Sequence, residues 1–342
     1  MDLNDLAHES ANYEYEDIDS GRNDKKPKPA KHKKAKSSGS KAAVKIVAVL
    51  GVLAIILGSM FSSVLGKFNY SENTQNEYVD SSALASSGKV INILVLGVDK
   101  RSEEQTSSRS DSMMLVSIDR ANKAVKMTSF LRDSWVYIPS EGINQRLNAA
   151  CTYGGYNGVR DTIEYNFGVK IDGYVTADFE MFEVIVDALG GVEVDVSEKE
   201  AKEVTNHQKR YGGVTLESGL QNLTGEQALA YCRIRKIDTD FVRTQRQRTV
   251  MSAIINKVKK SNPISLYSMA KNAAPYIETS LSKAQLMKAV TSALSCAGTI
   301  EQQQVPFEDT WSYATINGNS VIELNIEKNK QKLNDFIYGE SE

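Results

Sequence analysis

Three strand-like apolar runs lie close together between residues 89 and 133, and charged residues stand at their ends. The first run, Val90 to Val98, is short and rich in β-branched residues, which favours a buried strand over a helix. Two similar runs follow, Met113 to Ile118 and Ala124 to Leu131. Charged side chains at strand ends are better placed to meet a ligand than to fill a core. We therefore expect the functional site at this rim.

Carboxylates and guanidinium groups meet at the rim. In chain order they are Asp99, Arg101, Arg109, Asp111, Arg132 and Asp133. A polar loop, Ser102 to Ser110, joins the first two apolar runs. The sequence thus predicts a site built from acidic and arginine side chains.

Strand and helix patterns alternate further along the chain. Lys170 to Ala177 reads as a strand, Phe179 to Leu189 as an amphipathic helix, and Gly190 to Val196 as a strand that a glycine turn begins. The polar segment Glu198 to Gly213 is expected to be a mobile surface loop. This alternation indicates an α/β layered fold.

A capping-box motif predicts the start of a helix that leads to two arginines. Thr224 and Gln227 fit a capping box, and the helix that they begin is expected to run into Arg233. Arg233 and Arg235 lie two positions apart, which in an extended segment places both side chains on one side.

A second helix is expected from Asp240, as its N-cap, to about Lys260. Apolar residues recur along it at helical spacing, and the same face continues back to Gln247, Arg246 and Arg243. We expect Arg243 and Gln247 to face a ligand, whereas Arg248 is expected to be a solvated charge.

The segment Ile46 to Leu65 contains about 20 residues without a charge, enough to cross a bilayer as a helix. The lysine-rich stretch before it predicts a cytoplasmic N-terminus. We therefore expect a single-pass protein of the cell membrane. Its parts are a disordered basic cytoplasmic tail (1–45), a transmembrane helix (46–65), an extracellular linker (66–88) and an extracellular domain (89–342).

Two other interpretations of the N-terminal region are weaker. A cleaved signal peptide would have a shorter apolar segment, closely followed by a small-x-small cleavage site. The lysines could bind nucleic acid, but their position beside a membrane span favours topology and anionic lipid as the reasons for them. We expect a membrane partner and no nucleic acid.

The cysteines and histidines exclude several chemistries. Cys151, Cys232 and Cys296 are an odd number without CxxC spacing, so they are expected to be small buried hydrophobic residues. Only His207 lies in the exported domain, which argues against a histidine-based triad and a multi-histidine metal site.

The remaining candidates suit phosphate chemistry. Five arginines on a mildly acidic domain can grip a compact polyanion such as pyrophosphate, because each guanidinium binds phosphate oxygens bidentately. They are Arg109, Arg132, Arg233, Arg235 and Arg243. Asp99 and Asp111 would repel that ligand unless a hard cation lay between them, so we expect Mg²⁺, with Mn²⁺ as the alternative. The reaction that fits is phosphoryl transfer to a hydroxyl. For any single aspartate–arginine pair, an ordinary salt bridge remains the alternative.

Seven ordered motifs carry a resemblance to a known family. They are LVLGVDKR, SRSDSMMLVSID, SFLRDSWVYIP, INQRLNAA, DALGGVEVDV, LTGEQALAYCRIR and DFVRTQRQR. In this order, across residues 90–260, the chain resembles the LytR-CpsA-Psr family of cell-envelope proteins. The resemblance implies a single exported α/β sandwich domain with a central mixed sheet flanked by helices, behind one N-terminal transmembrane helix. It also implies a deep apolar pocket for a polyprenyl chain.

The resemblance further implies a membrane-anchored, Mg²⁺-dependent phosphotransferase. Such an enzyme moves an undecaprenyl-pyrophosphate-linked glycopolymer (teichoic acid, capsular or related polysaccharide) onto a peptidoglycan sugar hydroxyl and releases polyprenyl phosphate. Pyrophosphate cleavage is its expected side activity.

By position in these motifs, Asp99 and Asp111 look like the metal ligands, and Asp111 and Arg132 look like the catalytic residues. The head-group contacts look like Arg109, Arg132, Arg233, Arg235, Arg243 and Gln247. Asp240 and Arg101 look like supporting residues that hold the arginines in place. Leu131 and Val242 stand where the family often has proline and glycine, and neither change touches a phosphate contact.

Two functions without transferase activity remain as alternatives. One is a regulator of the cell envelope that only holds polyprenyl phosphate. The other is a transcription attenuator, which predicts DNA binding by the lysine tail.

Overall fold

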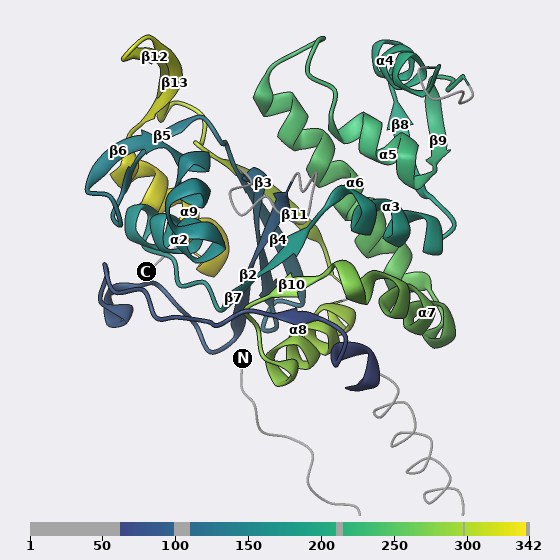
Figure 1. Ribbon diagram of the computed structural model, residues 1–342, viewed down its shortest axis with the longest axis horizontal. Coiled ribbons are helices and arrows are strands. Elements are labelled where there is room, and N and C mark those ends of the chain that lie inside the picture. The colour runs from purple at the N-terminus through teal and green to yellow at the C-terminus, as the bar shows by residue number, and fades with distance from the viewer. Residues whose placement is uncertain (1–61, 99–109, 210–214, 297, 340–342) are drawn as a thin grey trace, which may run out of the picture. The chain divides into compact units, whose positions relative to one another are not determined.

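The computed structural model describes residues 62–98, 110–209, 215–296 and 298–339 (Figure 1). The predicted basic tail lies outside these residues, and so does the predicted membrane span except for positions 62–65. Within the described ranges, no helix has the length and apolar character needed to cross a membrane. At the end of the predicted span, Leu65 is buried in a hydrophobic cluster of the domain.

A seven-stranded mixed sheet forms the centre of the fold, as predicted. Its order is β1-β10-β7-β2-β3-β4-β11. The three apolar runs became neighbouring antiparallel strands, β2 (Val90–Val98), β3 (Ser110–Asp119) and β4 (Ala124–Phe130). β7 (Gly173–Ala177) pairs in parallel with β2, and β11 (Ile300–Val305) pairs in parallel with β4. The short strands β10 (Glu278–Thr279) and β1 (Asn69–Tyr70) complete one edge.

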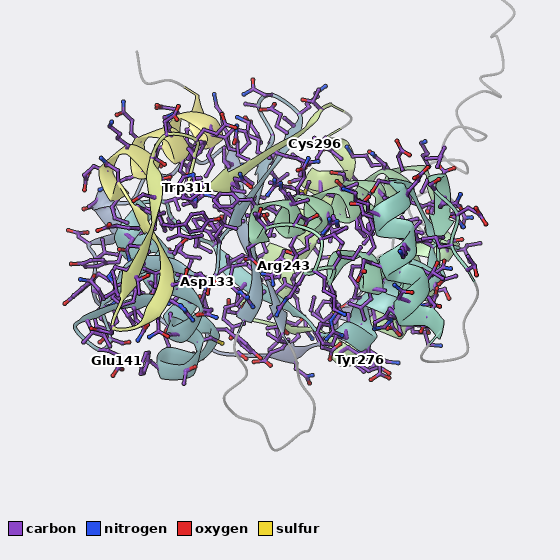
Figure 2. The ribbon with its side chains drawn as sticks, turned by 90° about the horizontal axis from the view of Figure 1, so that it is seen from above. Asp133, Glu141, Arg243, Tyr276, Cys296 and Trp311 are labelled. Carbon is purple, nitrogen blue, oxygen red and sulfur yellow. The ribbon has the colours of Figure 1, made fainter. Side chains whose placement is uncertain are left out.

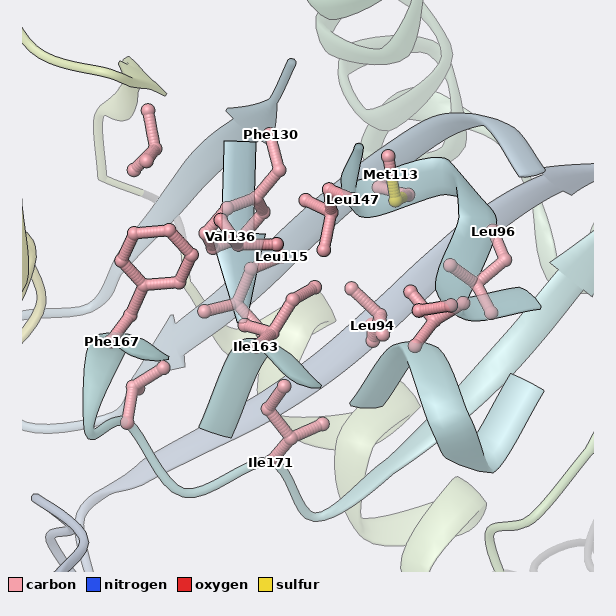
Figure 3. Close-up of a cluster of buried hydrophobic side chains, with 14 of the residues drawn as sticks. Leu94, Leu96, Met113, Leu115, Phe130, Val136, Leu147, Ile163, Phe167 and Ile171 are labelled. Atoms are coloured by element: carbon pink, nitrogen blue, oxygen red, sulfur yellow. The ribbon is translucent and has the colours of Figure 1, made fainter. Parts of the chain in front are cut away.

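Helices cover both faces of this sheet (Figure 1). On one face lie α2 (Ala150–Phe167) and α9 (Ile326–Tyr338), which bury the side chains shown in Figure 3. On the other face lie α6 (Asp240–Lys260) and α8 (Lys283–Ser295). Residues alternate between the faces, so that Met113 packs toward α2 while Met114 packs toward α6 and α8.

A second hydrophobic core lies beside the sheet. It is built by α3 (Phe179–Ala188), β8 (Val192–Val196), α4 (Glu198–Lys209), β9 (Gly219–Leu223) and α5 (Gly225–Cys232), together with α6. The prediction of a surface loop from Glu198 to Gly213 was wrong for its first part, which is helix α4. Ala201 and Val204 anchor this helix, because they are buried in the second core although their neighbours are polar.

Several local predictions are confirmed. Both hydrogen bonds of the capping box between Thr224 and Gln227 are present at the start of α5. In α2, Gly154 and Gly155 interrupt the helix, with a φ of 59° at Gly155, and Gly168 ends it in the left-handed conformation. The N-cap of α6 is Thr239 instead of Asp240. Asp240 lies in the first turn, which leaves its carboxylate available to side chains.

The segment 66–88 is packed on the domain, in contrast to the predicted linker. Its strand β1 pairs with β10, and the Asn76 amide donates to Glu164 Oε2 at 3.0 Å. Leu84 is also buried. The polar composition suggested a linker, but polar side chains such as Asn76 form hydrogen bonds with the domain surface.

A four-stranded sheet stands at one end of the central sheet, in the order β12-β13-β5-β6. Its strands are β5 (Ser134–Ile138), β6 (Ile143–Arg146), β12 (Trp311–Ile316) and β13 (Asn319–Leu324). The remaining elements are α7 (Pro263–Ala273), η1 (Ser81–Ala83), η2 (Leu147–Ala149) and η3 (Ala274–Tyr276). β5 starts directly after Arg132 and Asp133, so the β12–β13 hairpin lies close to the rim of the central sheet.

Candidate functional site

Three of the predicted arginines line one pocket, which we call the cationic pocket. Arg132 follows the end of β4, Arg235 lies between α5 and α6, and Arg243 lies on the first turn of α6. The other lining residues are Asp133, Asp238, Thr239, Asp240, Tyr313, Ser320, Val321 and Ile322. The two loop arginines and the helix arginine are distant in sequence, and only the packing of α6 beside β4 brings them together.

Asp240 connects two of these arginines. Its Oδ2 accepts a hydrogen bond from Arg243 Nη2 at 2.9 Å and lies 3.9 Å from Arg132 Nε. Burial raises the pKa of Asp240, and this effect exceeds the lowering by the Arg243 and Arg132 charges. The supporting role expected for Asp240 matches this geometry, since one carboxylate orients both guanidinium groups.

The cationic pocket is partly shielded from water. Arg243 is only 2% exposed, whereas the side chain of Arg132 is 22% exposed. Asp133 interacts with Arg132 Nε at 3.5 Å and with Arg146 Nε at 3.6 Å. Figure 2 labels Asp133 and Arg243 in this region. Guanidinium groups in such a setting attract a polyanion more strongly than exposed ones, because less water screens their charge.

An apolar cavity lies between the central sheet and helices α3, α5 and α6. Its walls include Val95, Met114, Phe179, Phe182, Leu229 and Met251. Gly97 lines it beside Ser112, and a Cβ at Gly97 would stand 2.8 Å from Ser112 Cβ, so only glycine fits there. The family resemblance implied a deep apolar pocket, and this cavity is the candidate for it.

Polar groups mark one part of the cavity wall. Gln247 Oε1 accepts a hydrogen bond from Ser112 Oγ at 3.0 Å, which places Gln247 toward the sheet as its helical phase predicted. Arg233 also lines the cavity, and its guanidinium lies 4.3 Å from the centre of the Phe179 ring. Arg233 is therefore not part of the cationic pocket. Arg233 and Arg235 do share a second, polar pocket with Glu203, His207 and Lys236.

The predicted metal ligands cannot be placed as side chains. Asp99, Arg101 and Arg109 lie outside the described residues, and so does the side chain of Asp111. The backbone of Asp111 is the extra residue of a β-bulge, because Val98 pairs with Ser110 and Gly97 pairs with Ser112. Bulges often occur beside active sites, where they redirect a side chain. Among the described residues, no cluster of three or more acidic, histidine or cysteine side chains could hold a metal.

Two other arginines of α6 are buried. Arg246 forms ion pairs with Glu200 and Asp238, so it connects α6 to α4 and to the loop before α6. The prediction that Arg248 is solvated was wrong, since the residue is 6% exposed. Burial lowers the pKa of Arg248 to about 10. Arg246 lies on the apolar face of α6 that the sequence indicated. Arg248 is buried because α6 is covered on more than one side, which a single apolar stripe does not indicate.

The three cysteines are buried, as predicted. Burial raises the pKa of Cys151 to about 11 and that of Cys232 to about 12. Thiols with such pKa values are poor nucleophiles at neutral pH.

The sequence interpretation missed the aromatic side of the cationic pocket. Tyr313 lines this pocket from β12, and Trp311 precedes it on the same strand. The hairpin turn contains Asn317 and Gly318, both with positive φ. An Asn-Gly pair between two β-like runs is a strong hairpin signal, and it could have revealed this element.

Comparisons with known proteins agree with this architecture. The model of the LytR_cpsA_psr family matches residues 59–335. The teichoic acid transferase TagU of Bacillus mycoides is 31% identical over 272 residues, which is 76% of this chain and 86% of that protein. TagT of Bacillus subtilis, also a polyisoprenyl-teichoic acid–peptidoglycan teichoic acid transferase, is 40% identical over 51% of this chain. The match spans only 55% of the length of TagT.

A solved structure of TagT with bound octaprenyl pyrophosphate lipid superposes with a TM-score of 0.60 at 26% identity. The superposition covers 79% of this chain and 99% of that structure.

Proposed function

Because the chain belongs to the LytR_cpsA_psr family, we propose that it transfers a glycopolymer from a polyprenyl pyrophosphate carrier to peptidoglycan. Similarity to the TagT and TagU transferases supports this class of reaction. The proposed cargo is a teichoic acid, a capsular polysaccharide or a related polymer. The product that leaves the enzyme would be polyprenyl phosphate.

The observation that carries the proposal is the convergence of Arg132, Arg235 and Arg243 around Asp240. Two linked phosphates present several oxygens in a small space, and planar guanidinium groups bind such oxygens in pairs. Arginine keeps its charge at any physiological pH, so all three guanidinium groups stay positively charged. These residues would hold the pyrophosphate and neutralise the charge that develops during transfer.

The neighbouring apolar cavity supports a lipid carrier. Its lining is mainly apolar, with Gln247 and Arg233 as polar exceptions. A polyprenyl chain in this cavity would be removed from water, while Gln247 and Arg233 would face the phosphate end. Burial of apolar surface would then contribute most of the affinity for the carrier.

The proposed reaction is a displacement at the phosphorus next to the sugar. A hydroxyl oxygen of peptidoglycan forms a bond to this phosphorus, and the bond to the bridging oxygen breaks. The bridging oxygen leaves with polyprenyl phosphate, and the hydroxyl proton passes to solvent or to a base. Arg132 would stabilise the oxygens of the attacked phosphate. This chemistry depends mainly on positioning and charge neutralisation.

We also propose that Asp99 and Asp111 hold Mg²⁺, or Mn²⁺ in its place. Two carboxylates at adjoining strand ends are hard oxygen donors of the type that Mg²⁺ prefers, and the bulge at Asp111 separates this residue from the regular pairing. A bound cation would neutralise phosphate charge. In this proposal Arg109 joins Arg132 as a contact to the phosphates.

The proposed location is the outer face of the cell membrane, with residues 46–65 as the anchor. A reporter enzyme that is active only outside the cytoplasm, fused to the C-terminus, tests this topology. Activity of the fusion is expected, and a cytoplasmic C-terminus would contradict the proposal.

The activity is tested with the full chain in detergent, a short lipid-pyrophosphate-linked glycan, Mg²⁺ and peptidoglycan oligomers. Covalent attachment of the glycan to the oligomers is expected. Arg132→Lys is expected to reduce transfer because an ammonium group cannot replace the bidentate contact. Arg120→Lys, on the surface after β3, is the matched control.

Binding of the lipid without transfer and without pyrophosphate cleavage would favour the regulatory alternative. No binding at all would contradict both.

A further inference from the structure

An aromatic cluster borders the cationic pocket on the side of the β12–β13 hairpin. Tyr313 lines the pocket together with Arg132 and Arg243. The Tyr313 ring meets the Trp311 ring edge to face at 5.0 Å, and Trp311 in turn packs on Phe241 of α6 at 4.6 Å. Figure 2 labels Trp311, Asp133 and Arg243, which come from the elements that enclose this region.

Core packing accounts for only part of this cluster. Trp311 and Phe241 are partly buried against each other, whereas Tyr313 is 61% exposed. Large aromatic rings at an exposed position on a pocket wall are typical of binding surfaces. The Trp311 and Tyr313 rings are nearly perpendicular, at 84°, and most of the Tyr313 side chain stays accessible.

Helix α6 contributes residues to the aromatic cluster and to both pockets. Phe241 and Arg243 lie on its first turn, whereas Gln247 and Met251 on the following turns line the apolar cavity. At a rise of about 1.5 Å per residue, Phe241 and Gln247 are separated by about 9 Å along the axis. The turn that carries Phe241 and Arg243 therefore lies before the turns that line the apolar cavity.

We propose that Tyr313, supported by Trp311 and Phe241, stacks on the sugar ring that is attached directly to the pyrophosphate. The proposal deepens the function proposed above and rests on it. Tyr313 shares its pocket with the arginines, and the apolar cavity lies farther along α6, which suits a donor of sugar, pyrophosphate and lipid. A pyranose has one face made mainly of C–H groups, which suits the electron-rich face of an aromatic ring.

This stacking would give the enzyme a contact with the polymer that does not depend on its charge. Lipid and pyrophosphate are common to many carriers, so a sugar contact is needed to distinguish a loaded carrier from an empty one. Tyr313 is close enough to the arginines to contact the first sugar, because both line the same pocket.

The experiment measures the affinity of the full chain in detergent for two lipids. One is polyprenyl pyrophosphate, and the other carries a single N-acetylhexosamine on the pyrophosphate. The wild-type chain is expected to bind the sugar-bearing lipid more tightly. Tyr313→Ala is expected to weaken binding of that lipid by about three- to tenfold, with no change for the sugar-free lipid.

Three further variants define the effect. Tyr313→Phe keeps the ring and is expected to retain the affinity for the sugar-bearing lipid. Trp311→Ala is expected to resemble Tyr313→Ala, because the ring loses its support. Tyr153→Ala removes a similarly exposed tyrosine of α2 and is expected to have no effect on either lipid.

The outcomes separate this proposal from the one on which it rests. Equal effects of Tyr313→Ala on the two lipids, or none on either, would overturn the stacking role alone. An unchanged donor affinity with a raised KM for peptidoglycan would assign Tyr313 to the acceptor sugar and likewise overturn it. If the wild-type chain bound neither lipid, both proposals would fail.

Discussion

Asp240 and Arg243 lie on the same turn of α6, and the Asp240 carboxylate accepts a hydrogen bond of 2.9 Å from the Arg243 guanidinium. The same carboxylate faces Arg132, which comes from the end of a strand in the central sheet. One acidic residue thus lies between a helix arginine and a loop arginine. In the proposed function, Asp240 is a positioning residue.

Asp240→Asn is therefore expected to impair catalysis more than binding. The amide keeps the shape of the side chain but cannot hold two guanidinium groups by charge, so Arg132 and Arg243 lose their common orientation. We expect kcat to fall by about 10- to 100-fold, since small errors in the position of catalytic groups are costly. The affinity for polyprenyl pyrophosphate should change much less. Steady-state kinetics and calorimetry give the two values.

The control for this prediction is Asp195→Asn on the exposed side of β8. A kcat for Asp240→Asn equal to that of the control would contradict the positioning role.

Arg246→Met is expected to destabilise the fold. Arg246 donates to Glu200 Oε1 at 2.7 Å and also pairs with Asp238, so its removal leaves two carboxylates without a cation. Breaking a buried ion pair on one side costs about 3 kcal/mol or more. Denaturant unfolding at neutral pH measures the loss. The double variant R246M/E200Q should recover part of it, and full stability of R246M would refute the assignment.

The same ion pair predicts a pH dependence. Burial raises the pKa of Glu200, but the hydrogen bonds from Arg246 and Ser197 lower it by more. The net shift of the Glu200 pKa is therefore downward. A lowered pKa in the folded state means that Glu200 contributes stability above its unfolded pKa. This contribution is lost as the pH falls through the lowered folded value. The acid-induced loss of stability should be smaller in Glu200→Gln than in the wild type.

Arg248→Met is expected to stabilise the chain. No described carboxylate forms an ion pair with the Arg248 guanidinium, and burial alone lowers its pKa to about 10. The folded state binds the Arg248 proton more weakly than the unfolded chain does. The resulting loss of folding stability is complete at neutral pH and declines as the pH rises through the lowered pKa. Replacing a buried charge by an apolar side chain commonly adds about 1 kcal/mol or more.

Denaturant midpoints of Arg248→Met and of the surface variant Arg120→Met provide the comparison. An unchanged or lower midpoint for Arg248→Met would show that its charge has a stabilising partner.

Removal of divalent cations is expected to stop transfer. If Asp99 and Asp111 hold Mg²⁺, a chelator should abolish glycan attachment, and added Mg²⁺ or Mn²⁺ should restore it. Asp99→Asn and Asp111→Asn should each raise the Mg²⁺ concentration needed for half-maximal activity. Undiminished transfer in excess chelator would exclude the metal role, and Asp195→Asn again serves as the control.

Local sequence signals predicted the elements that carry the site. The apolar run Val90–Val98 coincides with β2, and the capping box starts α5 at the expected residue. α6 ends at Lys260 as expected and begins one residue early, with Thr239 as its N-cap. These predictions were accurate because hydrophobic period and capping act over a few neighbouring residues.

Contacts between distant segments explain the wrong predictions. The polar segment of α4 became a helix because Val204 reaches the second core and Glu200 meets Arg246. Residues 66–88 are held on the domain by pairing of β1 with β10, which lie far apart in the chain. Arg248 is buried because α6 packs across the edge of the sheet next to Gln304. Composition cannot indicate such partners.

The sequence by itself determined the apolar strands of the central sheet, the helices α5 and α6, and the family to which the chain belongs. Only the tertiary structure decided that Asp240 stands between Arg132 and Arg243, that Arg233 faces the apolar cavity, and that Tyr313 joins the cationic pocket. Secondary structure arises from interactions between neighbours in the chain. A binding site depends on how distant segments pack, and that packing is settled by the shape and burial of the whole domain.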